Sequence, residues 1–124
     1  MKKKTITLLV IGFTLVTLFV ITAFAANPVN GITVSMSTST SSSSAFATNK
    51  VTAPSTATIT AAYISVYNAA GTRVNYNGGS GSGNYYSYKL GTNWSKSPNY
   101  AVGSSSAKIN GSYLQGGTAT ISFS

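Results

Sequence analysis

The chain lacks four residue types on which most enzymes and metal sites depend. Its 124 residues contain no cysteine, aspartate, glutamate or histidine. Acid–base catalysis near neutral pH, glycoside hydrolysis by two carboxylates, and Ser-His-Asp or Cys-His nucleophiles all need some of these residues. Zinc, copper and iron lose their usual ligands, and calcium loses its carboxylates. We therefore expect no enzyme, no cofactor, no metal site and no disulfide.

Negative side chains are absent, so every formal charge is positive. Of the eight lysines and arginines, three lie at positions 2–4, and the other five are Lys50, Arg73, Lys89, Lys96 and Lys108. A chain that carries only cations is attracted to anionic surfaces such as teichoic acids or anionic lipids. Scattered cations also keep a protein soluble, and that simpler explanation stays open. Nucleic acid is not an expected partner of an exported chain.

The longest apolar run lies at the N-terminus. Lys2, Lys3 and Lys4 precede an apolar stretch over residues 6–21, which ends in the small-x-small sequence Ala23-Phe24-Ala25. This order predicts a secretory signal peptide over residues 1–25, cleaved after Ala25. The stretch is also about long enough to span a bilayer, so an uncleaved anchor is the alternative. In both cases we expect the remaining chain to be extracellular, either secreted or held at the cell surface.

Residues 26–124 predict one all-β domain. β-branched and aromatic residues alternate with polar ones, glycine-rich turns separate these runs, and no helical period follows residue 25. We expect a small antiparallel β-sandwich, with a Ser/Thr-rich N-terminal strand and loop over residues 26–50 and the sandwich body over residues 51–124.

The first strand and the segment after it allow two interpretations. Ile32, Val34 and Met36 share one face of a half-buried strand. We interpret residues 37–44 as the end of this strand followed by a flexible loop; the alternative is the polar continuation of an edge strand. Asn49-Lys50 is interpreted as a turn.

The clearest strand covers residues 56–67. Its apolar positions change parity at Ala61-Ala62, which indicates a bulge or burial on both faces. Residues 68–71 predict a turn, and residues 72–77 a returning strand with Val74 and Tyr76 in or near the core. Residues 84–90 form another strand, residues 91–99 are irregular, and residues 100–102 and 104–110 give two short strands. Asn110-Gly111 then turns the chain toward a last strand over residues 118–123.

Aromatic residues and lysines gather between positions 85 and 100. Tyrosine outnumbers phenylalanine in this part of the chain, and amphipathic tyrosine rings are common on binding surfaces. Half of these rings are equally well explained as caps on a small core. The candidate binding residues, for sugars of a wall polymer or a membrane interface, are Tyr85, Tyr86, Tyr88, Lys89, Trp94, Lys96 and Tyr100.

Two further motifs carry little weight. Ser105-Ser106-Ala107-Lys108 fits the S-x-x-K pattern of serine β-lactamases. Twenty serines in residues 26–124 make a chance match the simpler explanation. The glycine-rich run at residues 78–83 has no Lys-Ser after it and predicts a loop rather than a phosphate site.

The overall plan resembles small secreted proteins of Gram-positive bacteria. The features that carry this likeness are the lysine-rich start, Ala23-Phe24-Ala25, the Ala107–Gly111 sequence and the aromatic-ended residues 118–123. The plan is similar to the lactococcin 972 class of bacteriocins, which are cationic, cysteine-free β-sandwiches that act on cell-wall synthesis. The likeness implies a bacteriocin-like protein that binds an anionic component of the bacterial envelope. The alternative is a non-toxic surface or matrix protein that binds wall glycans or self-associates through edge strands around residues 33–44.

Overall fold

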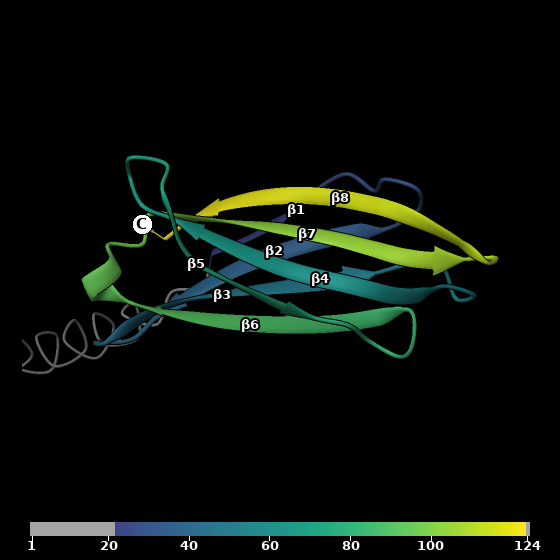
Figure 1. The fold of residues 1–124 in the computed structure, drawn as a ribbon, viewed down its shortest axis with the longest axis horizontal. Coiled ribbons are helices and arrows are strands. Elements are labelled where there is room, and N and C mark those ends of the chain that lie inside the picture. Colours follow the sequence, from purple (N-terminus) through teal and green to yellow (C-terminus); the bar gives the residue numbers. More distant parts are fainter. Residues whose placement is uncertain (1–21, 124) are drawn as a thin grey trace, which may run out of the picture.

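The protein is a two-layer antiparallel β-sandwich, as the alternation predicted. In the computed structural model, residues 22–123 are described, and they form two four-stranded sheets packed face to face (Figure 1). In sheet one the order is β1 (Thr22–Ala25), β2 (Thr33–Thr40), β3 (Ser44–Thr52) and β6 (Tyr85–Asn93). In sheet two the order is β5 (Arg73–Gly79), β4 (Thr58–Tyr67), β7 (Tyr100–Ile109) and β8 (Ser112–Ser122). A short 3₁₀ helix, η1 (Trp94–Lys96), follows β6, and no helix within residues 22–123 is long and apolar enough to cross a membrane.

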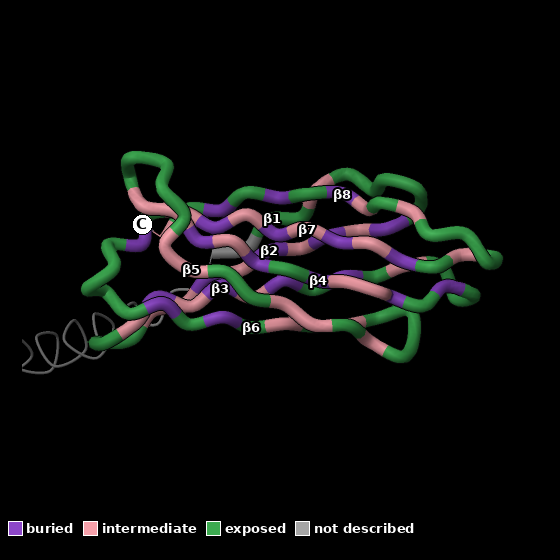
Figure 2. Tube along the Cα trace, viewed as in Figure 1, coloured by how far each residue is buried: buried purple, intermediate pink, exposed green. Residues whose placement is uncertain are grey.

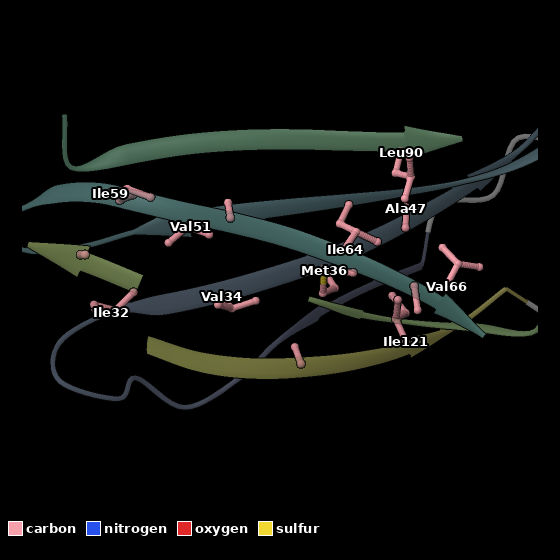
Figure 3. Packing of buried hydrophobic residues seen from close by; sticks show 14 of the residues in the cluster. Ile32, Val34, Met36, Ala47, Val51, Ile59, Ile64, Val66, Leu90 and Ile121 are labelled. Atoms are coloured by element: carbon pink, nitrogen blue, oxygen red, sulfur yellow. The ribbon is translucent and has the colours of Figure 1, made fainter. Parts of the chain in front are cut away.

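Alternation along the strands builds the core. In β2, Val34 and Met36 are fully buried between the sheets, whereas Ser35 and Ser37 point outward and are half-buried. The same two-residue period runs along β3, β6, β7 and most of β8, as the alternating colours of Figure 2 show. Each buried Val, Ile, Leu or Met stabilises the fold by about 1.5–3 kcal/mol. The labelled core side chains in Figure 3 are Ile32, Val34, Met36, Ala47, Val51, Ile59, Ile64, Val66, Leu90 and Ile121.

One buried amide joins the two sheets. Asn49, in β3, is fully buried, and its Nδ2 donates to the carbonyl oxygens of Tyr63 (3.0 Å) and Ser104 (3.1 Å) in sheet two. Gly103 leaves the space for this amide, because a Cβ there would collide with Met36 and lie 3.1 Å from the Asn49 amide. Asn49 Oδ1 has no partner within residues 22–123. The cost of burying that oxygen therefore offsets part of the gain from the two hydrogen bonds.

Of two predictions for the N-terminal half, one is confirmed and one is wrong. Residues 37–44 contain a strand end followed by a loop, because β2 ends at Thr40 and β3 starts only at Ser44. Asn49-Lys50 is not a turn but lies inside β3. Side chains that favour turns sit here in a strand whose neighbours satisfy the backbone, so tertiary pairing overrides local preference.

The second half agrees better with the sequence. The β4–β5 hairpin is present, and the predicted bulge appears as a register shift between Ile59 and Ala61. The turn at Asn110-Gly111 is confirmed, with φ values of 50° and 81° that suit a two-residue hairpin. The two short strands predicted over residues 100–110 form the single strand β7. Tyr76 faces solvent rather than the core.

The segment predicted as a signal peptide lies mainly outside the described residues. Residues 1–21 of that segment have no described structure, and its last four residues form β1. β1 pairs with β2 in register from Thr22 opposite Thr38 to Ala25 opposite Ser35. The fold therefore includes the residues just before the predicted cleavage point.

Candidate binding face

The structure spreads the seven predicted binding residues over several surfaces. Along β6, Tyr85 and Lys89 point outward from sheet one, whereas Tyr86 and Tyr88 turn inward and pack against the core. Two of the three tyrosines in this strand are thus partly buried against the core. These two rings fit the alternative explanation, that tyrosines cap a small core.

Trp94 and Lys96 lie at one end of the sandwich. The Trp94 indole Nε1 donates to the carbonyl oxygen of Ser41 at 2.8 Å, and the Trp94 backbone N–H donates to the carbonyl oxygen of Ser43 at 3.1 Å. Asn93 caps η1 by accepting from the Ser95 N–H. Trp94 therefore ties η1 to the β2–β3 turn, which is a structural task that the sequence did not indicate.

Tyr100 lies on the outer face of sheet two. Its ring stacks on that of Tyr67, with ring centroids 5.1 Å apart and an interplanar angle of 13°. Tyr67 and Tyr100 are directly opposite each other across β4 and β7. Tyr100 is thus separated from Tyr85, which points outward from the other sheet.

Tyr100 belongs to a larger aromatic surface, which we call the tyrosine face. We define it as Tyr63, Tyr67, Tyr76, Tyr100 and Arg73, all on the outer side of sheet two. Tyr63 and Tyr76 stack with centroids 5.6 Å apart at 20°, and the Arg73 guanidinium carbon lies 4.6 Å from the centre of the Tyr76 ring. Two stacked pairs and one cation–π contact therefore lie on adjacent strands.

The local sequence explains how the tyrosine face forms. Tyr63 and Tyr67 alternate in β4 with the buried Ile64 and Val66, so the pleat directs both rings outward. Gly78 lies opposite Tyr63 in β5, and a Cβ at Gly78 would collide with the Tyr63 ring. The missing side chain lets this ring lie across β5, where it reaches Tyr76.

A second cation–aromatic contact extends the same side of the molecule. Lys108 points outward from β7, and its Nζ lies 5.4 Å from the centre of the Tyr113 ring in β8. The chain has no side-chain carboxylate, so neither Lys108 nor Arg73 is neutralised by an acidic side chain. Sheet two thus presents aromatic rings and positive charges along its length.

The chemistry available on the tyrosine face is recognition. Within residues 22–123, the hydroxyls of its four tyrosines have no hydrogen-bond partner. Stacking uses one face of a ring, so the hydroxyl and the remaining surface can meet a ligand. Hydroxyl donors beside a guanidinium suit phosphate and sugar oxygens.

The sequence held a partial signal for this surface. Tyr63 and Tyr67 lie opposite Ile64 and Val66 in the predicted strand, so their outward direction follows from parity alone. Their partners could not be found this way, because Tyr67 and Tyr100 meet only through the pairing of β4 with β7.

The S-x-x-K match does not form a site. Ser105 is buried, and its Oγ donates to the Gly117 carbonyl at 3.2 Å. Lys108 points outward from the same strand, so the two side chains leave β7 on opposite faces.

No protein-family model matches the chain, and no curated protein matches it.

Proposed function

We propose that the protein is a secreted, cationic β-sandwich that binds an anionic, hydroxyl-rich polymer of the bacterial envelope through its tyrosine face. The observation that carries this proposal is the cluster of two stacked tyrosine pairs with Arg73 on one sheet surface. A teichoic-acid-like polymer of phosphates and polyols or sugars offers matching acceptors. The uniform positive charge of the chain supports the same choice, because it concentrates polyanions near the surface.

Binding to isolated Gram-positive cell walls tests this proposal. Tyr63→Ala and Tyr76→Ala should each weaken wall binding by about tenfold, as expected where a contact worth about 1.4 kcal/mol is lost. Arg73→Gln should weaken binding and reduce its salt dependence, because a phosphate contact is removed. Walls from which the phosphate polymer has been extracted should bind the protein poorly.

Matched controls exist on the other sheet. Tyr85 is exposed on the outer side of sheet one, and Lys50 is an exposed cation of the same sheet. Tyr85→Ala and Lys50→Gln should leave wall binding within about twofold of the original. Equal losses from both sheets would reduce the interaction to unspecific charge attraction and refute the tyrosine face as a site.

Growth inhibition is the additional property that the likeness to the lactococcin 972 class implies. Purified protein spotted on a panel of Gram-positive strains tests it directly. Killing of a narrow set of strains, lost in Tyr76→Ala, would identify a bacteriocin-like activity that acts through the tyrosine face. Wall binding without killing would support the non-toxic surface protein.

A further inference from the structure

β1 covers an edge of the sandwich that the predicted cleavage would open. The pairing of β1 with β2 places Phe24 opposite Met36 and Thr22 opposite Thr38. The Ala26 N–H continues this ladder by donating to the Val34 carbonyl at 3.0 Å. Because hydrogen-bonded pairs alternate in an antiparallel ladder, Val34, Met36 and Thr38 direct their backbone groups toward β1.

The predicted cleavage point is the end of this strand. Hydrolysis of the Ala25–Ala26 peptide bond consumes one water and leaves a carboxylate on Ala25 and an amino group on Ala26. β1 then belongs to the released peptide, and only the Ala26 contact to Val34 remains on the domain. The N–H and C=O groups of Met36 and Thr38 lose their partners.

The opened edge lacks the features that normally prevent strand addition. Edge strands are protected by charged residues, prolines and bulges. β2 has no proline and no charge, the first cation after residue 25 is Lys50, and the β2–β3 ladder has no register shift. β2 is therefore a regular, neutral strand of eight residues whose outer side is free beyond the Ala26 contact to Val34.

The other edges are better protected. β5 carries Arg73 and a register shift against β4, and β6 carries Lys89. The edge strand β8 also has a register shift, and its Gln115 carbonyl already accepts from Asn30 Nδ2 at 2.8 Å. In a molecule whose cations repel other copies, β2 is the neutral edge where two copies can meet.

We infer that cleavage after Ala25 opens β2 and that the vacant position is taken by β2 of a second copy. The two strands pair antiparallel about a two-fold axis, so each copy offers the same edge to the other. Because Ala26 still covers Val34, we centre the register on Ser37, which pairs Met36 of each copy with Thr38 of the other. Sheet one of each copy, which has three strands without β1, then joins sheet one of the other copy in one continuous sheet.

The β2 dimer is independent of wall binding by the tyrosine face, which lies on the other sheet. It depends on the predicted cleavage and on the geometry of β2. The absence of cysteine makes the dimer directly testable, because a single introduced thiol has no other cysteine to react with.

Cysteine cross-linking in the secreted product of the full-length chain is the test. Ser37→Cys places the two sulfurs next to the axis, at a Cα separation of about 4.5 Å that a disulfide can bridge. Thr48→Cys is the matched control, since Thr48 neighbours Ser37 on the same outer face but lies one strand inward, on β3. The N-terminus of each product is read by mass spectrometry.

We expect a product that starts at Ala26, elutes as a dimer and forms a disulfide efficiently through Ser37→Cys but not through Thr48→Cys. Ser37→Lys, which sets two like charges opposite each other at the axis, should weaken dimerisation by about tenfold or more. A product that starts at Ala26 but stays monomeric would overturn the inference. So would equal cross-linking of both cysteine variants, or a dimer linked through residue 37 that still carries β1.

Discussion

The side chain of Asn49 shows how strongly one atom can determine stability. Its Nδ2 faces two carbonyl oxygens of sheet two, and both interactions require a donor at that position. Asparagine and aspartic acid have nearly the same shape, so their exchange changes hydrogen bonding and charge but hardly any packing.

We therefore predict that Asn49→Asp destabilises the fold by about 3 kcal/mol or more at neutral pH, because a buried carboxylate would face two carbonyl oxygens. Burial should raise the pKa of this new carboxyl above its unfolded value, so the folded state binds a proton more readily. Stability should then recover as the pH falls and decline as it rises.

Urea unfolding between about pH 4 and 8, the range in which such a carboxyl titrates, measures both effects. Asn99→Asp is the control, since Asn99 is exposed and its side chain makes no hydrogen bond within residues 22–123. If Asn49→Asp and Asn99→Asp unfold alike, Asn49 does not join the sheets in the way described.

At the scale of elements, the turns are set by backbone conformation rather than by contacts. Gly111, in the β7–β8 turn, has φ +81°, and a Cβ there would meet nothing within 4 Å. A Cβ at Gly83, before β6, would also meet nothing within 4 Å, but Gly83 has no positive φ. A side chain would collide with nothing at either glycine, so a comparison of the two positions isolates the cost of the positive φ at Gly111.

We predict opposite effects of alanine at these two positions. Gly111→Ala should destabilise the protein by about 1–2 kcal/mol, because the left-handed region penalises a Cβ. Gly83→Ala should be neutral or stabilise it by about 0.4–1 kcal/mol, since it restricts only the unfolded chain. Chemical denaturation of both variants gives the comparison, and a loss at Gly83 as large as at Gly111 would contradict it.

Alternation predicted the elements well wherever apolar and polar residues differ clearly. Ile32, Val34 and Met36 indicated β2, and the parity change at Ala61-Ala62 indicated the bulge in β4. The pattern failed at Thr38, which is buried although polar. A strand of hydroxyl residues resembles a linker in sequence, because only its neighbours reveal which side is covered.

The candidate site was harder to predict for a similar reason. Closeness in sequence suggested residues 85–100, but neighbouring residues of a strand point to opposite faces. Tyr86 therefore packs against the core, whereas Tyr67 stacks on Tyr100 from another strand. Strand order, which the sequence did not supply, decides which rings share a surface.

For the whole molecule, the missing carboxylates and imidazoles predict a flat stability profile. Side chains with an ordinary pKa between about 4 and 8 are absent, so folding changes proton binding little in this range. With equal proton binding in both states, the slope of stability against pH is zero. The free energy of unfolding should vary by less than about 0.5 kcal/mol from about pH 5 to 8.

Denaturant unfolding at several pH values and constant ionic strength tests this prediction. Constant ionic strength matters because the cations repel one another, and salt screens that repulsion. A clear slope within the range would show a titrating group that folding perturbs.

The placement of the cations gives the molecule two positive faces. Lys50 and Lys89 project from the outer side of sheet one, and Arg73 and Lys108 from that of sheet two. The two layers are only about 10 Å apart. A polyanion held on the tyrosine face would therefore leave the cations of sheet one uncompensated, and the complex would keep one positive face toward solvent.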